Sequence, residues 1–329
     1  MPQSVEPIAA AQAVITEIRE TIAARLLGLD HAVDSLCIAL MTHGHILLED
    51  VPGVGKTELA KTFADALGLS FRRIQCTPDL MPADIVGGLV FHPREAEFVL
   101  RRGPIFTHVL LVDEINRALP RTQSALLEAM AEGQVTIDGT AHRLPQPFLV
   151  MATQNPLESQ GVFPLPEAQL DRFLLKTSLG YPAPRHDLGI LSLHLQNRPR
   201  EDTRPLENSG DPGSTPAPIS ILEEAVTAVR FASDVLAYVA AITRATRTRP
   251  DIEVGASPRA MILLAQAARA QAVLAGRNFV IPDDVQKVAA RVLFHRLLRV
   301  TADEDVDPEA WMADLLGEVR VPLEDEEIP

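Results

Sequence analysis

The chain begins with apolar residues at helical spacing. Between Ala9 and Thr42 they recur every three or four positions, and Gly28 interrupts the pattern once. Spacing of this kind places the apolar side chains on one face of a helix. Two helices are therefore expected before the first strand.

Short apolar runs then alternate with further helical segments. Five of these runs have the length of a strand, at residues 45–49, 70–74, 109–112, 148–153 and 173–178. Apolar strands separated by helices are typical of a parallel sheet with helices on both faces. The first part of the chain, residues 1–197, is therefore predicted to be an α/β domain.

The pattern changes at residues 198–219, which hold five prolines and follow neither the helical nor the strand period. This composition is typical of a linker. Helical spacing returns at residues 221–229, 233–247, 257–275 and 282–298, with no strand-like run between them. Residues 220–300 are therefore predicted to form a small, entirely helical second domain.

The formal charge of −14 is concentrated at the end of the chain. Residues 301–329 contain eleven acidic residues and one arginine, so this tail carries −10 and the rest of the chain −4. A protein that holds nucleic-acid backbone needs a basic surface, so direct binding of nucleic acid is not expected. For the tail itself, a solvated terminus is favoured over a docking peptide.

Composition adds three expectations. With 329 residues, of which 47% are apolar, the chain can bury a sizeable core and form two domains. No positively charged leader and no apolar run of membrane-spanning length is seen, which favours a cytoplasmic location. Cys37 and Cys76 lack metal-ligand spacing and lie among apolar residues, so both are expected to be buried free thiols.

A glycine-rich loop follows the first predicted strand and precedes a helical pattern. Residues 50–57 read Asp-Val-Pro-Gly-Val-Gly-Lys-Thr, which is the arrangement of a phosphate-binding loop. Its backbone N–H groups converge on phosphate oxygens, Lys56 reaches the outer phosphates, and the Thr57 hydroxyl meets Mg²⁺. Asp50 stands where the pattern has its first glycine, a position that starts the turn without contacting phosphate. The predicted nucleotide-binding residues here are Asp50, Val51, Pro52, Gly53, Val54, Gly55, Lys56, Thr57 and Glu58.

Two carboxylates end the third predicted strand. Four apolar residues lead into Asp113 and Glu114, at the edge where open α/β sheets bind ligands. Asp113 is predicted to hold the metal through water, and Glu114 to polarise the attacking water as general base. The alternative is a strand that ends in a helix cap.

Two further polar residues follow the later strands. Asn155 ends the fourth strand before a proline, where it can orient the attacking water and contact the γ-phosphate; the alternative is a simple turn. Arg172 lies at the start of the last strand, where it can act as a finger on a neighbouring subunit's nucleotide. The alternative for Arg172 is a surface ion pair with Asp171 or Glu167.

An arginine also begins a helix of the second domain. Ser257 is predicted to cap this helix and Pro258 to be its first residue, which places Arg259 in the first turn. The positive end of the helix dipole disfavours a cation there. Contact with phosphate would explain the arginine.

The chain closely resembles the MoxR family of AAA+ ATPases from about residue 15 to residue 300. The resemblance is carried by the loop at 50–57, the Asp113-Glu114 strand, Ala152-Thr-Gln-Asn155, Leu170-Asp-Arg-Phe173 and Gly255-Ala-Ser-Pro-Arg259. It implies an α/β AAA+ domain with a small all-α lid, with Arg172 as the arginine finger and Arg259 as the sensor-2 residue. By the same resemblance, Leu26, Leu27 and Gly28 begin the adenine pocket.

Turn chemistry indicates the two hairpin insertions that this clade carries. One is expected at about residues 87–106 within the second helix, and the other at about 132–147, with Asp138-Gly139 as its turn. By resemblance, both hairpins face the axial side of a ring and engage a client protein. The alternative is that they only extend the sheet.

The resemblance also implies a function. MoxR-like proteins are thought to be chaperone-like ATPases, using ATP and Mg²⁺, that mature or activate client complexes. They form rings, here expected to be hexameric, and often work with a separate von Willebrand factor A domain protein. Three alternative functions share some of these motifs: a motor subunit of a metal chelatase, a DNA-associated motor, and a small-molecule kinase. The kinase fits least, because it needs neither Asn155 nor Arg172.

Overall fold

Two helices precede the sheet in the computed structural model of the chain, which describes residues 6–51, 53–94, 96–155, 161–195, 216–300 and 306–322. They are α1 (Glu6–Ala23) and α2 (Asp30–Met41), as the periodicity predicts. Pro52 and most of the predicted linker lie outside the described residues.

Five parallel strands form the central sheet in the order β2-β5-β8-β1-β9. Each lies on one of the five apolar runs, which confirms the predicted parallel sheet. Because the strands are parallel, all their carboxyl ends meet at one edge. The strands are β1 (Ile46–Glu49), β2 (Phe71–Gln75), β5 (Val109–Asp113), β8 (Leu149–Gln154) and β9 (Leu175–Thr177).

Side chains of the central strands alternate between two cores on opposite faces of the sheet. In β5, Leu111 belongs to one core and Leu110 to the other, because successive side chains of a strand point to opposite faces. The first core continues into α1, α2 and α3 (Lys56–Ala66), and the second is covered by α5 (Pro120–Glu132). The sheet therefore has helices on both faces.

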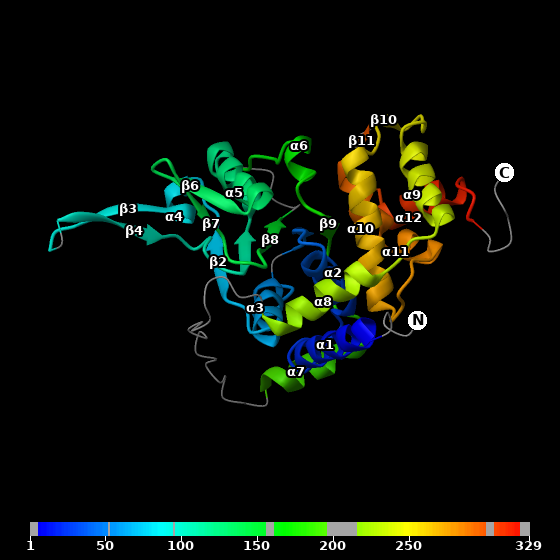
Figure 1. The fold of residues 1–329 in the computed structure, drawn as a ribbon, viewed down its shortest axis with the longest axis horizontal. Coiled ribbons are helices and arrows are strands. Elements are labelled where there is room, and N and C mark those ends of the chain that lie inside the picture. The colour runs from blue at the N-terminus through cyan, green and yellow to red at the C-terminus, as the bar shows by residue number, and fades with distance from the viewer. Residues whose placement is uncertain are drawn as a thin grey trace.

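Two antiparallel hairpins lie within the two stretches predicted for them. The first joins β3 (Gly87–His92) to β4 (Glu97–Arg102) and extends away from the sheet in Figure 1. The second joins β6 (Gln134–Ile137) to β7 (Thr140–Arg143) through Asp138 and Gly139, which both have positive φ. Positive φ at both central residues matches the right-handed twist of the strands.

The second domain, called the lid below, packs on the N-terminal helices on the far side from the first hairpin (Figure 1). Its core is continuous with the first core of the sheet domain. It also contains a short antiparallel pair of strands, β10 (Ile252–Val254) and β11 (Leu298–Arg299), which the helical periodicity did not predict. The helices are α8 (Ala217–Ala228), α9 (Ser233–Thr246), α10 (Pro258–Leu274), α11 (Pro282–Leu293) and the 3₁₀ turn η3 (Phe294–Arg296).

The expectation of a solvated terminus is wrong for part of the acidic tail. Helix α12 (Pro308–Gly317) packs on the lid with Met312 and Leu315 buried, and the Trp311 indole N–H donates to Asp251 at 2.7 Å. Several tail acids are partners rather than free charges: Asp314 and Glu318 both pair with Arg249. The expectation rested on the net charge of the tail and did not take into account the helical spacing of its apolar residues.

Both thiols are buried and free, as expected. Burial raises the pKa of Cys37 and of Cys76 to about 12, so neither thiol is ionised at neutral pH. No helix in the described part of the chain has the length and apolar character needed to cross a membrane.

Candidate nucleotide-binding site

A cavity of about 400 Å³ opens at the carboxyl edge of the sheet. It brings together side chains that are as far apart in the sequence as the glycine-rich loop and the end of β8. Its volume falls within the usual range for sites that bind small ligands. The cavity is lined by Asp50, Gly53, Gly55, Lys56, Thr57, Glu58, Arg73, Gln75, Asp113, Glu114, Thr153 and Asn155.

The glycine-rich loop has the backbone conformation that its sequence predicts. Gly53 and Gly55 have φ of 91° and 94°, a region that side chains with a Cβ rarely adopt. Gly55 is the residue before the first turn of α3, and it lines the cavity together with Lys56 and Thr57. The first N–H groups of a helix have no partner within the helix and can bind an anion. The Lys56 ammonium donates to the Asp50 carbonyl oxygen at 3.1 Å. The arrangement suits a phosphate group.

Asp50, the departure from the glycine pattern, has a structural role. Its carboxylate accepts hydrogen bonds from the Leu179 N–H at 2.6 Å and the Gly180 N–H at 3.0 Å. Asp50 is buried, and these two N–H groups belong to the segment that follows β9. A glycine cannot make these bonds, so the aspartate ties the start of the phosphate-binding loop to that segment.

Asp113 and Glu114 end β5 at the wall of the cavity. Asp113 is buried; one of its oxygens accepts from Arg73 Nε at 2.6 Å, and the other from the Thr153 hydroxyl at 3.3 Å. Glu114 has the left-handed conformation, with φ 55° and ψ 51°, and its carboxylate pairs with Arg117 at 3.0 Å. Its side chain does not cap the 3₁₀ turn η1 (Ile115–Arg117) that follows.

The backbone of Glu114 is held in this unfavourable conformation by its neighbours. The Glu114 N–H donates to the Thr153 hydroxyl at 2.9 Å, and that hydroxyl in turn contacts Asp113. A left-handed non-glycine residue costs of order 1–3 kcal/mol, and such residues cluster at functional sites. The hydroxyl therefore fixes the relative placement of the two carboxylates.

Asn155 follows β8 and lines the same cavity as the two carboxylates, although about forty residues separate them. Parallel pairing of β8 with both β1 and β5 places its end beside the phosphate-binding loop on one side and Asp113 on the other. The role of Asn155 as a sensor of the γ-phosphate stays a prediction.

Leu27 and Gly28, assigned to the adenine pocket by resemblance, lie outside the residues that line the cavity. They contact η2 (Pro184–His186) and α7 (Asp187–Leu195): a Cβ on Gly28 would lie 3.0 Å from the His186 ring, and one on Gly189 would lie 2.6 Å from Leu27. Leu26 lies beside Gly55 of the loop. Their role toward the base stays a prediction.

Arg172 and Arg259 also lie outside the cavity lining. Among the described residues, Arg172 forms an ion pair with neither Asp171 nor Glu167. The Asp171 carboxylate is instead paired with Arg296 at 2.8 Å and with Arg259 at 3.4 Å. The Ser257 hydroxyl caps α10 by accepting from the Ala260 N–H at 3.1 Å, as predicted. The roles of both arginines toward phosphate remain predictions.

Both domains match known sequence families. The profile of the ATPase family associated with various cellular activities (AAA) matches residues 45–175, and that of the AAA lid domain matches residues 244–315. The chain is 41% identical over 311 residues to Chaperone MoxR1 of Mycobacterium tuberculosis, covering 90% of this chain and 79% of that protein. It is 34% identical to Protein MoxR of Methylorubrum extorquens, covering 84% and 85%.

The chain belongs to the MoxR family of AAA+ ATPases. A crystal structure of a protein from Cytophaga hutchinsonii has a TM-score of 0.82 with this MoxR-family chain at 33% identity, covering 97% and 98% of the two chains. The predicted AAA+ α/β fold with a lid is thereby confirmed, and the family implies that nucleotide is bound.

Reasoning from the sequence missed three residues that line the cavity of this MoxR-family protein: Arg73, Gln75 and Thr153. Arg73 donates to both Asp113 and Gln75, at 2.6 Å and 3.0 Å. The available signal was a pair of charged residues, Arg72 and Arg73, within the otherwise strand-like run at 70–74. Using it would have required the strand order, in which β2 lies directly beside β5.

Proposed function

We propose that this MoxR-family protein binds ATP with Mg²⁺ and hydrolyses it, and that a ring of identical subunits uses this reaction to remodel, mature or activate a client protein complex. The observation that supports the proposal best is the convergence of five functional side chains on one cavity. They are Lys56, Thr57, Asp113, Glu114 and Asn155.

Each of these residues supplies what phosphoryl transfer to water needs. Lys56 places a positive charge beside the outer phosphates, and Asn155 orients the attacking water. Glu114 takes the proton of that water as general base. Arg117, 3.0 Å from the Glu114 carboxylate, would help to orient this base. The acceleration of hydrolysis is therefore attributed mainly to the positioning of the water and to the charges placed around the phosphates.

The donor set also fits a magnesium ion. The Thr57 hydroxyl would bind Mg²⁺ directly and Asp113 would hold it through water, since hydroxyl and carboxylate oxygens are the ligands this cation prefers. Both residues line the cavity. When bound, the ion neutralises charge on the phosphates. Arg73 and Thr153 orient the Asp113 carboxylate from two sides.

The position of Arg172 supports the proposed ring. This arginine does not line its own subunit's cavity, and within the described residues no carboxylate pairs with it. A finger that acts on the next subunit's nucleotide needs such a placement, and closed rings with one repeated interface are the usual way to provide it. The family resemblance suggests six subunits.

Mixed rings test this arrangement. Arg172→Ala subunits lack the finger but keep their own phosphate-binding loop, whereas Lys56→Ala subunits lack the loop but keep the finger. Mixtures should therefore regain part of the ATPase activity that each variant alone lacks. Mixtures as inactive as the separate variants at every ratio would argue that Arg172 acts only within its own subunit.

Client contact is assigned to the β3–β4 hairpin. Its cross-strand pairs Val90–Val99 and Phe91–Phe98 are exposed, and Phe98 alone is 67% exposed. The two pairs lie on opposite faces of the two-stranded hairpin, so both of its faces expose apolar side chains. Exposed apolar surface of this kind marks an interaction site. A separate protein with a von Willebrand factor A domain is the expected partner, since the family resemblance implies one.

Substitution of the loop lysine tests ATP binding itself. Lys56→Ala should abolish the binding of a fluorescent ATP analogue and the release of phosphate, because the loop loses its only lysine at the phosphates. Lys61→Ala, on the same helix but outside the cavity lining, is the matched control and should bind normally. Tight binding by Lys56→Ala would refute the assignment of the loop.

A further inference from the structure

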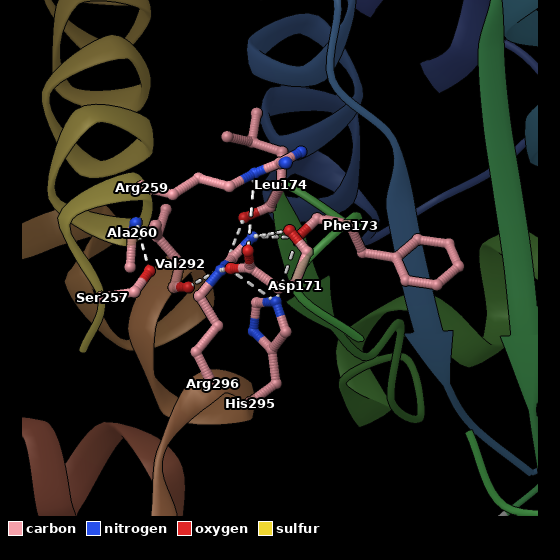
Figure 2. A network of polar contacts seen from close by, with 9 residues as sticks. All are labelled: Asp171, Phe173, Leu174, Ser257, Arg259, Ala260, Val292, His295 and Arg296. Atoms are coloured by element: carbon pink, nitrogen blue, oxygen red, sulfur yellow. Dashed lines mark hydrogen bonds and ion pairs between the residues drawn. The ribbon is translucent and has the colours of Figure 1, made fainter. Parts of the chain in front are cut away.

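One side chain of the lid holds the segment that carries Arg172. The Arg296 guanidinium, from η3, donates to the Asp171 carboxylate at 2.8 Å through Nε and to the Asp171 carbonyl at 3.2 Å through Nη2. It also donates to the carbonyls of Phe173 and Leu174. Figure 2 shows these contacts converging on Arg296. The carbonyls of residues 171 and 173 flank Arg172, so its backbone is fixed on both sides.

The contacts of Arg296 lie in a buried junction between the lid and the sheet domain. Its side chain is only 3% exposed, and the neighbouring His295 ring contacts the Phe173 carbonyl at 3.1 Å. A buried guanidinium is stable only when its donors are paired, since burial without partners costs several kcal/mol. Most of the hydrogen-bond partners of Arg296 belong to the segment 171–174, so these bonds hold the lid and the segment together.

The same segment meets a second arginine of the lid. Arg259 Nε lies 3.4 Å from the Asp171 carboxylate, on the oxygen that Arg296 Nε does not use. Figure 2 shows the two arginines approaching Asp171 from α10 and from η3. Asp171 is therefore occupied by two cations of the lid. Arg172 is the next residue along the chain, and it pairs with no carboxylate of the described residues.

We infer that Arg296 is a positioning residue for Arg172, through which the lid of one subunit sets the placement of the finger that serves the next subunit. This inference rests on the proposed ring and on the finger role of Arg172. Its physical basis is the geometry of the junction: movement of η3 carries the carbonyls of residues 171 and 173 with it. A misplacement of about 1 Å in a catalytic group can reduce the rate about 10²-fold.

The substitution Arg296→Lys tests the inference. Lysine keeps the charge but cannot donate to four oxygens as a planar fork. We expect kcat for ATP to fall by tenfold or more while the affinity for a fluorescent ATP analogue changes by less than about twofold. Mixing with Lys56→Ala subunits, which carry an intact finger segment, should restore turnover.

Arg249→Lys is the matched control. Arg249 is also a mostly buried arginine of the lid, and it pairs with Asp251, Asp314 and Glu318 rather than with the finger segment. The Arg249→Lys variant should have a less stable lid but should keep the wild-type kcat for ATP. If a general weakening of the lid were the cause, kcat would fall in both Arg296→Lys and Arg249→Lys. Mixing with Lys56→Ala subunits would then not restore it.

Asp171→Asn provides a second test if Arg296→Lys folds poorly, because asparagine keeps the size of the side chain and one acceptor. It should show the same loss of kcat and the same rescue by Lys56→Ala. If the Arg172→Ala mixture is rescued and neither of these mixtures is, the inference is wrong and the proposed finger stands. If the Arg172→Ala mixture also fails, the finger assignment and the inference fall together.

Discussion

His45 lies directly before β1, and its buried ring bridges two other elements of the sheet domain. Its Nδ1 accepts from the Val150 N–H at 3.1 Å, and its Nε2 lies 3.1 Å from the Met130 carbonyl oxygen. Both bonds require a neutral ring with the proton on Nε2. Burial lowers the pKa of His45 from 6.5 to about 4, because the charged form loses its solvation.

The depressed pKa makes stability depend on pH. Below pH 6.5 the unfolded chain takes up a proton on His45, whereas the folded protein resists protonation until about pH 4. The unfolded state then binds more protons, so the free energy of unfolding falls as the pH falls. Linkage gives a loss of roughly 2 kcal/mol at pH 5 relative to pH 7 from this residue alone.

Urea unfolding, followed by far-UV circular dichroism at pH 7 and pH 5, measures this contribution. His45→Asn keeps an acceptor for the Val150 N–H but does not titrate, so it should destabilise the protein at pH 7 and by roughly 2 kcal/mol less at pH 5. Phe148→Leu, which removes the ring packed edge-on against His45 at 5.8 Å, is the control and should cost the same at both pH values. An equal penalty for His45→Asn at both pH values would show that His45 does not cause the pH dependence.

Two further predictions concern the phosphate-binding loop and the hairpin. Asp50→Ala leaves the N–H groups of Leu179 and Gly180 without their acceptor, so thermal unfolding should show a loss of about 2–3 kcal/mol, with weaker binding of ATP. Unchanged stability and affinity would remove Asp50 from this role. Phe98→Ser should keep basal ATPase activity but suppress aggregation of a heat-denatured reporter protein less well, as measured by light scattering. Ile262→Ser, at an exposed apolar residue of the lid, is its control; equal losses in both would contradict the assignment of the hairpin.

Periodicity and motif spacing predicted what depends on neighbouring residues in the chain. All five strands of the central sheet lie on the predicted apolar runs. The Asp138-Gly139 turn has the positive φ angles that those residues tolerate. The parallel sheet then brings Asp113 and Asn155 to one edge. The local sequence was sufficient for these features because each is set by side-chain period or turn chemistry.

Features that depend on distant pairing were not predictable in the same way. The bonds from Asp50 reach residues about 130 positions later, and Arg73 meets Asp113 only because β2 and β5 are adjacent. The sequence offers Asp171 as a partner for Arg172, but the Asp171 carboxylate is occupied by two lid arginines that lie far along the chain. One sequence does not show which distant charges meet.

The cavity at the carboxyl edge of the sheet is proposed to bind and hydrolyse ATP with Glu114 as its general base. The most direct test compares wild type with Glu114→Gln for binding of a fluorescent ATP analogue and for phosphate release in the presence of Mg²⁺. We expect the variant to bind like wild type and to turn over slower by roughly 10²-fold or more, because only proton abstraction is lost. Wild-type turnover by Glu114→Gln, or a wild-type protein that binds ATP without releasing phosphate, would contradict the account.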